Sequence, residues 1–236
     1  MNRTPLILVP GLISDDDVWG GQLAALGTGR EVRVFRCGRQ ASIASMAEDL
    51  LRGAPDHFAV AGSSMGGYVA LAATLQAPQR ILGLALVATS ARADDEIQHT
   101  ARDEGISRAR SGQFAQLIQD MAIAAAHPLP PDHPLVAHIV TMLGRCSPLD
   151  YISQQRAIAS RPDQWARLPE IHCPTVIVSG AADCVVPCAR SQELHDRLPG
   201  STLHVIPDVG HAVTQAAPEI VTEVLLRWVA HTDPQT

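Results

Sequence analysis

The sequence predicts an α/β fold: a doubly wound, mostly parallel central sheet of about six main strands, interrupted by one helical insertion. Short apolar runs alternate with segments whose apolar residues recur at helical spacing. Such alternation is typical of a parallel sheet with helices on both faces. The alternation stops near Ser90 and resumes at Thr175, so we expect the insertion to lie within one α/β unit rather than between two domains.

In the first part of the chain, apolar runs predict strands and periodic segments predict helices. The first run ends at Pro10-Gly11, a loop signal. Val32 and Val34 alternate with arginines, as in a strand with one face more exposed to solvent. Ser42 precedes an apolar stripe and can cap a helix. In order, we predict strand 6–9, helix 18–26, strand 31–37, helix 42–51, strand 58–61, helix 64–75 and strand 81–88.

Residues 91–170 contain no convincing strand and several helical stretches, such as Phe114–Ala126, and a proline-rich tract at 127–134 divides them. After them we predict strand 175–178, helix 189–198, strand 202–206 and helix 218–229. We therefore assign residues 1–90 and 171–236 to the α/β core and residues 91–170 to the helical insertion.

Composition excludes several functional classes. The net charge of −6 argues against nucleic acid as a partner. No run approaches the roughly 18 apolar residues of a membrane span, and the apolar start is shorter than the ~7–15 residues of a signal peptide. We therefore expect a cytoplasmic protein that acts on a small molecule. All 18 basic residues are arginine, which excludes a phosphate-loop lysine and a pyridoxal-phosphate Schiff base.

Possible metal ligands are present but poorly spaced. Five scattered cysteines (37, 146, 173, 184 and 188) form neither a disulfide framework nor a zinc motif. Three histidines (127, 133 and 138) are separated by prolines, so solvated loop positions are the favoured interpretation. Acidic residues at 15–17 are expected to cap a helix, and those at 94–96 to be a solvated helix start. We expect no metal and no organic cofactor.

The segment Gly62-Ser63-Ser64-Met65-Gly66-Gly67 is the most informative motif. Only Ser64 is flanked as G-x-S-x-G, between Gly62 and Gly66, and a predicted strand precedes it and a predicted helix follows it. This context is that of a nucleophile elbow, a tight turn that exposes the serine hydroxyl. Glycines on both sides remove the Cβ atoms that would clash in such a turn.

A serine nucleophile requires a base and an acid later in the chain. Asp183 follows the predicted strand 175–178, and His211 follows the predicted strand 202–206. All three residues fall after the carboxyl ends of parallel strands, where open α/β sheets place their sites. Separately, Asp183 could be a turn residue and His211 a capped turn, but the agreement of three positions favours a catalytic triad.

Over nearly its whole length the chain resembles the α/β-hydrolase superfamily. The matching pieces are L-V-P-G-L (8–12), G-S-S-M-G-G (62–67), C-P-T-V-I-V-S-G-A-A-D-C-V-V-P (173–187) and I-P-D-V-G-H (206–211). The resemblance implies that Ser64 is the nucleophile, His211 the base and Asp183 the residue that orients the imidazole. It also implies that residues 91–170 are the family's helical cap, which covers the serine and determines substrate choice.

By the same resemblance, the backbone N–H groups of Leu12 and Met65 form the oxyanion hole. The chain departs from the family at two places. Many relatives carry His-Gly where this chain has Pro10-Gly11, and that histidine helps to shape the oxyanion loop. The first predicted strand also lies almost at the start of the chain, so the family's leading β-hairpin is not expected and six main strands rather than eight remain.

These residues predict a serine hydrolase that cleaves a carboxylic ester or lactone through an acyl-enzyme. The same triad could instead cleave C–C bonds or act as a lyase, and a ligand-sensing protein that signals through a partner is an alternative from another class. Apolar residues of the insertion (117, 118, 121, 139, 142 and 143) are expected either to line an acyl pocket or to pack within the insertion. Arginines 102, 108, 110 and 145 could bind a substrate carboxylate, although each could equally be a surface residue.

Overall fold

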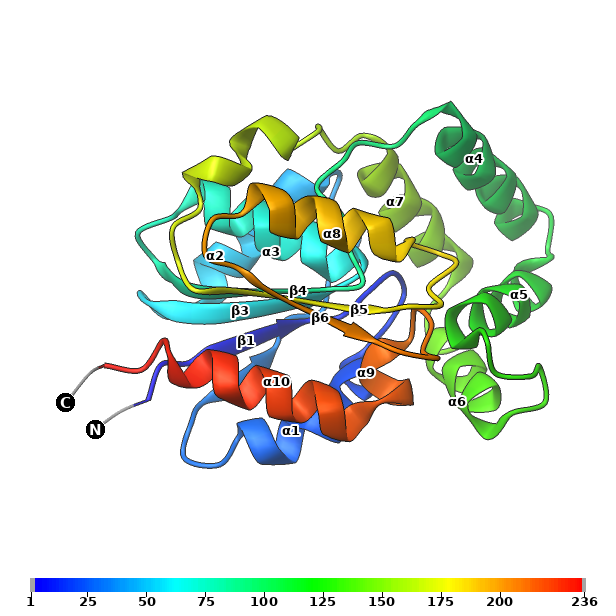
Figure 1. Cartoon of the computed structure of the whole chain (residues 1–236). Helices are drawn as coiled ribbons and strands as arrows, with labels where there is room; N and C mark the ends of the chain where they lie inside the picture. The colour runs from blue at the N-terminus through cyan, green and yellow to red at the C-terminus, as the bar shows by residue number, and fades with distance from the viewer. Residues whose placement is uncertain (1–2, 235–236) are drawn as a thin grey trace.

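A six-stranded, fully parallel sheet organises the protein. The computed structural model describes residues 3–234, and within them the strands lie side by side in the order β2-β1-β3-β4-β5-β6 (Figure 1). Their bounds are β1 Leu6–Val9, β2 Val32–Val34, β3 Phe58–Ser63, β4 Ile81–Val87, β5 Thr175–Gly180 and β6 Thr202–Ile206. The predicted fold class is therefore confirmed.

Helices cover both faces of the sheet (Figure 1). One face carries α1 (Gly20–Leu26), α9 (Val213–Ala216) and α10 (Pro218–Ala230), and the other carries α2 (Ile43–Gly53), α3 (Met65–Gln76) and α8 (Cys188–Arg197). The alternation along β1 shows why two layers form. Leu6 and Leu8 belong to the core on the α10 side, whereas Ile7 and Val9 belong to the core on the α3 side, as expected from side chains that point alternately to opposite faces.

Helix α3 lies at the centre of its layer and is apolar on all sides. Every residue from Met65 to Leu75 is buried, as expected of a helix that lacks a polar face. Ser64 immediately precedes this helix and ends the turn from β3. A fully packed helix therefore fixes the position of the serine.

Four helices lie between β4 and β5 in the chain: α4 (Glu96–Arg110), α5 (Phe114–Ala126), α6 (Pro134–Leu143) and α7 (Pro148–Ala159), followed by a 3₁₀ helix, η2 (Trp165–Glu170). Figure 1 shows α4 to α7 gathered at one end of the sheet. Residues 91–170 are called the cap segment below. Because residues of this segment lie beside Ser64 in one cavity, the segment covers the carboxyl ends of the strands.

Several element boundaries differ from the predicted ones. The predicted helix 18–26 consists of a 3₁₀ helix, η1 (Asp16–Trp19), followed by α1, and Asp15 caps it by accepting a hydrogen bond from the Asp17 amide at 3.0 Å. The edge strand β2 spans three residues instead of seven and pairs with Leu6–Leu8 of β1 over that length. Strands β3 and β5 run two residues further than predicted.

The prediction of a solvated acidic start for α4 is wrong for Asp94. Asp95 caps the helix, whereas the Asp94 side chain is completely buried and forms ion pairs with Arg161 at 2.8 Å and with Arg102. Burial by itself would raise the pKa of Asp94, but the hydrogen bond from Arg102 and the charge of Arg161 outweigh it and lower the pKa below its usual value. Asp94 is therefore a structural anion that ties α4 to the segment after α7.

No helix in residues 3–234 is long and apolar enough to cross a lipid bilayer.

Candidate active site

Ser64 occupies a strained turn between β3 and α3. Its backbone has φ 53° and ψ −117°, a region that non-glycine residues rarely adopt. Three hydrogen bonds hold this conformation: Ser64 N donates to Val87 O at 2.8 Å, Gly67 N donates to Ser64 O at 2.9 Å, and the Thr89 hydroxyl donates to Ser64 O at 2.8 Å. The surroundings therefore impose the elbow that the sequence predicts.

The glycines of the motif are required by close backbone approaches. A Cβ atom at Gly62 would lie within 3.0 Å of the Gly66 carbonyl oxygen, and one at Gly66 would lie equally close to the carbonyl oxygens of Val9 and Pro10. The elbow thus packs directly against the end of β1. This explains in steric terms why glycine is needed on each side of Ser64.

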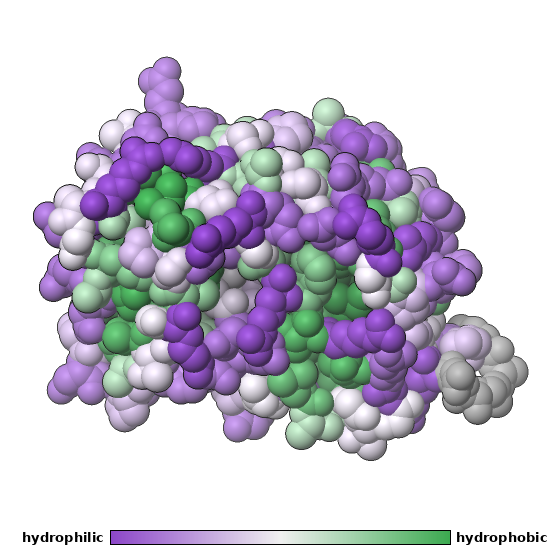
Figure 2. Space-filling view, turned by 180° about the vertical axis from the view of Figure 1, so that it is seen from behind, coloured by the Kyte–Doolittle hydropathy of each residue, from purple (hydrophilic) through white to green (hydrophobic). Residues whose placement is uncertain are grey.

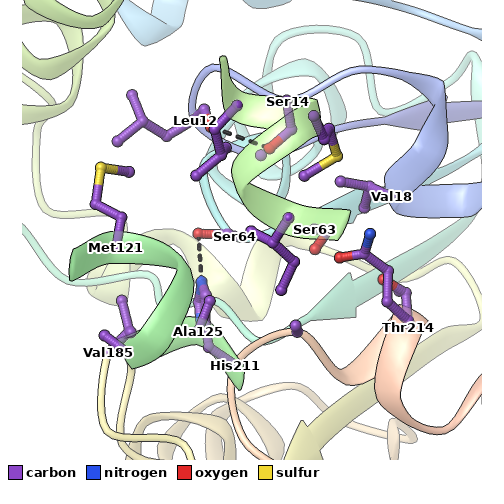
Figure 3. A pocket seen from close by; sticks show the side chains of 17 residues that line it. Leu12, Ser14, Val18, Ser63, Ser64, Met121, Ala125, Val185, His211 and Thr214 are labelled. Atoms are coloured by element: carbon purple, nitrogen blue, oxygen red, sulfur yellow. Dashed lines mark hydrogen bonds between the residues drawn. The ribbon is translucent and has the colours of Figure 1, made fainter. Parts of the chain in front are cut away.

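The three predicted triad residues lie in one hydrogen-bonded chain. His211 Nε2 lies 2.9 Å from Ser64 Oγ, and His211 Nδ1 lies 2.8 Å from Asp183 Oδ2; Figure 3 shows the contact between Ser64 and His211 as a dashed line. Asp183 follows β5, and His211 lies between β6 and α9. Since an ionised carboxylate only accepts hydrogen bonds, His211 Nδ1 must donate, and Nε2 is left free to accept the serine proton.

The backbone fixes the Asp183 carboxylate. Its side chain is completely buried, and Oδ1 accepts hydrogen bonds from Val185 N and Val186 N, both at 2.8 Å. Oδ2 is therefore the oxygen that remains for His211. The two backbone N–H groups therefore fix which carboxylate oxygen faces His211.

The C-terminal end of α5 contacts both loops that carry these residues. Ala212 N donates to Ala125 O at 2.8 Å, the Cys184 thiol donates to Ala124 O at 3.3 Å, and His127 Nδ1 contacts Ala182 O at 3.2 Å. A Cβ atom at Gly210 would clash with the His127 carbonyl oxygen. The last carbonyl groups of this helix, which have no partners within the helix, therefore bind the loops of Asp183 and His211.

The two predicted oxyanion-hole residues flank Ser64: Leu12 lines the same cavity as the serine, and Met65 follows the serine directly in the chain. Within residues 3–234, neither Leu12 N nor Met65 N donates a hydrogen bond. Met65 is the first residue of α3, and amide groups at the start of a helix lack internal acceptors. Two unpaired N–H groups beside a serine hydroxyl are suited to stabilise negative charge on an oxygen.

A cavity of about 270 Å³ opens beside the serine hydroxyl. Figure 3 shows Leu12, Met121, Val18 and Thr214 around the hydrogen-bonded Ser64 and His211. The lining is mostly apolar and comes from the core and from the cap segment. It consists of Gly11, Leu12, Ser14, Val18, Ser63, Ser64, Met121, Ala124, Ala125, Ile139, Met142, Leu143, Val185, His211, Ala212, Thr214 and Gln215.

The cap-segment residues proposed from sequence divide into two groups. Met121, Ile139, Met142 and Leu143 line the cavity. Leu117 and Ile118 do not line it and are buried in the packing of the cap segment. All six are apolar in the sequence, but which of them line the cavity depends on how α5 and α6 are packed relative to Ser64, and that is a property of the tertiary structure.

Within residues 3–234, no arginine lines this cavity. Three of the four arginines considered from sequence bind carboxylates of the protein: Arg102 binds Asp94, Arg108 binds Asp120 at 2.6 Å, and Arg145 binds Asp15 at 2.8 Å. The fourth, Arg110, is exposed. None of them is placed to receive a substrate carboxylate.

The histidines considered as metal ligands have separate roles. His127 contacts the loop of Asp183, and His133 caps α6 by accepting a hydrogen bond from Leu135 N at 3.1 Å. His138 is exposed on α6. In residues 3–234, no group of three or more His, Cys, Asp or Glu side chains is arranged to hold a metal ion.

Three polar residues that line the cavity or hold the site were not identified from the sequence. Thr89 holds the Ser64 carbonyl, and Ser14 and Thr214 border the cavity. Each is a common loop or helix residue, and its role depends on contacts between segments that are distant in the sequence. The local position of Thr89, just after a strand, is the only feature that could have indicated it.

Comparisons with known proteins agree with this architecture. The Alpha/beta hydrolase family matches residues 6–224. A candidate carbamate hydrolase, RutD, of Caulobacter sp. (strain K31) is 28% identical, with 97% of this chain and 91% of that protein covered. A pimeloyl-[acyl-carrier protein] methyl ester esterase of Aromatoleum aromaticum is 26% identical, with 93% of this chain and 95% of that protein covered.

Among solved structures, a thermophilic esterase from Thermogutta terrifontis, solved with malate bound, superposes with a TM-score of 0.88 at 26% identity. The alignment covers 99% of this chain and 92% of the esterase chain. The family match spans all six strands and the cap segment. The chain therefore belongs to the alpha/beta hydrolase family.

Proposed function

We propose that this protein, a hydrolase of ester bonds, cleaves a carboxylic ester or lactone of a small, neutral molecule through an acyl-enzyme on Ser64. The observation that carries the proposal is the continuous hydrogen-bonded chain from Ser64 through His211 to Asp183 at the mouth of an apolar cavity. Relatives named as esterases support the ester bond as the target.

In the first half of the reaction, His211 Nε2 accepts the Ser64 hydroxyl proton as Oγ attacks the acyl carbon. Asp183 accepts the Nδ1 hydrogen bond and stabilises the imidazolium that forms. The amides of Leu12 and Met65 donate to the oxygen that becomes negative. When the tetrahedral intermediate collapses, the bond to the alcohol oxygen breaks, and the alcohol leaves with the proton from His211.

In the second half, water replaces the alcohol. His211 Nε2 takes a proton from the water as its oxygen attacks the acyl carbon of the Ser64 ester. The same two amides bind the oxyanion, and Ser64 Oγ leaves with the proton returned by His211. This half releases a carboxylic acid and regenerates the enzyme. Over the whole reaction, one ester and one water give one carboxylic acid and one alcohol. In a lactone the leaving alcohol stays attached to the acyl group, and one hydroxy acid is released.

The cavity favours a neutral substrate. Its lining includes Met121, Ile139 and Met142, and the described part of the chain contributes no arginine to it. An ionised group buried there would lose its hydration without gaining a counter-ion, which is costly. A neutral apolar chain would instead gain free energy in proportion to the apolar area it buries.

A phosphonate ester with a p-nitrophenol leaving group tests the nucleophile. We expect one equivalent of the phosphonate to attach to the peptide that contains Ser64. The release of p-nitrophenol and the loss of esterase activity should proceed at the same rate. The Ser64→Ala variant should gain no mass, and Ser63→Ala, which alters the neighbouring serine, should be labelled like the wild type. Attachment at another residue, or activity that survives full labelling, would refute the acyl-enzyme.

Two esters of matched length test the preference for neutral substrates. We expect p-nitrophenyl valerate to be hydrolysed with a kcat/KM at least 100-fold above that of the p-nitrophenyl monoester of glutaric acid, since the second carries a carboxylate at the end of the chain. Equal values for the two esters would contradict the assignment of the apolar cavity to the acyl chain.

The alternative of a sensor that signals through a partner requires a wide apolar surface on the cap segment. In the cap segment, Ile97 and Leu149 are the large hydrophobic residues that are exposed. On the face drawn in Figure 2, hydrophilic side chains predominate and hydrophobic residues form separate small patches. These observations favour the enzyme over the sensor.

A further inference from the structure

Gln154 is a buried polar residue that the mechanism above does not use. It lies on α7 of the cap segment and is 3% exposed. Its Oε1 accepts a hydrogen bond from Ile13 N at 2.7 Å, and its Nε2 donates to Cys37 O at 3.0 Å and to Gly38 O at 3.3 Å. The carboxamide thus joins the cap segment to the loops that follow β1 and β2.

The orientation of this carboxamide is determined by its partners. A backbone N–H can only donate and a backbone carbonyl can only accept. The oxygen must therefore face Ile13, and the nitrogen must face Cys37 and Gly38. The group makes three hydrogen bonds, and its loss would leave the buried Ile13 N–H unpaired, a costly condition.

Ile13 has an unfavourable backbone conformation. Its φ is +43°, which is rare for a β-branched residue and indicates strain held by the surroundings. The Ile13 side chain is 1% exposed. Three hydrogen bonds maintain this turn: Ser14 N donates to Gly11 O at 3.3 Å, the Ser14 hydroxyl donates to Leu12 O at 3.0 Å, and Ile13 N donates to Gln154 at 2.7 Å. Among these, the bond to Gln154 is the one that comes from the cap segment.

Leu12 lies directly before Ile13, and its amide is one of the two proposed oxyanion donors. The direction of the Leu12 N–H depends on the backbone of the turn from Pro10 to Ser14. This turn also packs against the nucleophile, since a Cβ atom at Gly11 would lie 3.4 Å from Ser64 Cβ. A hydrogen bond that holds Ile13 therefore also holds Leu12 N relative to Ser64.

We propose that Gln154 is a positioning residue for the oxyanion hole, which it holds in place through Ile13. The inference rests on the proposed function of Ser64 and extends it. It gives the cap segment a role in the chemical step, in addition to covering the cavity.

The test compares Gln154→Leu with Gln155→Leu. Gln155 is the adjacent residue on α7, is equally buried, and binds Arg102 and Tyr151 inside the cap segment, away from the cavity. Both variants lose buried hydrogen bonds, so both are expected to lower the melting temperature. Only Gln154→Leu is expected to disturb the oxyanion hole.

For Gln154→Leu we expect kcat for p-nitrophenyl butyrate to fall about 10- to 100-fold, because one oxyanion donor is displaced, and complete removal of such a donor costs ~10²–10³-fold. KM should change by less than threefold. A butylboronic acid, which forms a tetrahedral anion on the serine, should bind 10- to 100-fold more weakly. Gln155→Leu should keep kcat and boronate affinity within threefold of the wild type.

Equal kcat and boronate affinity in the two variants would overturn the inference. If Gln154→Leu does not fold, Gln154→Met replaces it, because this neutral, unbranched side chain is closer to glutamine in shape and makes none of the three hydrogen bonds. The same 10- to 100-fold fall in kcat is then expected, and a smaller loss would contradict the role of Ile13. Ser64→Ala in the same assay separates the two proposals, because its retained activity would refute the proposed function itself.

Discussion

The most detailed prediction concerns Asp183→Asn, which should disable His211 without changing the fold. In the wild type, Oδ1 of Asp183 accepts hydrogen bonds from Val185 N and Val186 N at 2.8 Å. An asparagine must place its single amide oxygen there, because its NH₂ group cannot accept these bonds. The NH₂ group then faces His211 Nδ1, which must become the acceptor.

This exchange forces the wrong histidine tautomer. With Nδ1 accepting, the ring carries its proton on Nε2, the atom that lies 2.9 Å from Ser64 Oγ. The imidazole can then no longer accept the serine proton. Loss of the correct tautomer and of the carboxylate costs about 10⁴-fold in kcat, which corresponds to about 5.4 kcal/mol of barrier.

The assay is hydrolysis of p-nitrophenyl butyrate, with the melting temperature measured on the same samples. Asp208→Asn is the matched control, because Asp208 is exposed in the loop before His211 and has a φ of +57°, a conformation that asparagine tolerates. We expect the control to keep its kcat. An Asp183→Asn variant with more than a tenth of the wild-type kcat would refute this reasoning.

Three further predictions concern packing, charge and thiol reactivity. Gly66→Ala should lose about 3 kcal/mol or more of stability, because its Cβ atom would overlap the backbone at the end of β1. Gly53→Ala is the control and should change the melting temperature little, because Gly53 has open space around it. Equal melting temperatures for the two variants would contradict the steric explanation. Asp94→Asn should lose about 3 kcal/mol at pH 7, because two arginines would be left without their buried anion. The folded-state pKa of this carboxyl is lowered, so its contribution to the free energy of unfolding is present above the unfolded-state pKa and is lost as the pH falls through the folded-state pKa. In urea unfolding, a stability difference between wild type and Asp94→Asn that grows on acidification would contradict this. Iodoacetamide at pH 8 should label the exposed Cys184 first and leave Cys37 unmodified, since burial raises the pKa of Cys37 to about 12, and peptide mass spectrometry that finds Cys37 labelled early would contradict its burial.

The parts of the site that depend on local geometry could be predicted from the sequence. Ser64 was identifiable because a tight strand-to-helix turn demands glycine at 62 and 66, and these steric demands leave a readable spacing. Asp183 and His211 were identifiable because each follows an apolar strand, and the carboxyl ends of parallel strands share one edge of a sheet. Their hydrogen-bonded arrangement agrees with this prediction.

The parts that depend on contacts between distant segments could not be predicted. Gln154 meets Ile13 across a sequence separation of 141 residues, and a glutamine within a helix gives no signal of such a contact. Asp94 was expected to be solvated because an acidic run before a helix usually is, yet it is buried between Arg102 of the following helix and Arg161, which lies 67 residues further along the chain. The local sequence pattern predicts secondary structure better than it predicts the hydrogen-bonding partners of a polar side chain.

The most direct test of the central claim is hydrolysis of p-nitrophenyl butyrate by the wild type and by Ser64→Ala at equal concentration. The claim predicts measurable turnover by the wild type and a loss of at least 10³-fold in the variant, with an unchanged melting temperature, because His211 and the oxyanion amides cannot form an acyl-enzyme without the hydroxyl. A folded Ser64→Ala variant that keeps most of the wild-type turnover would contradict it.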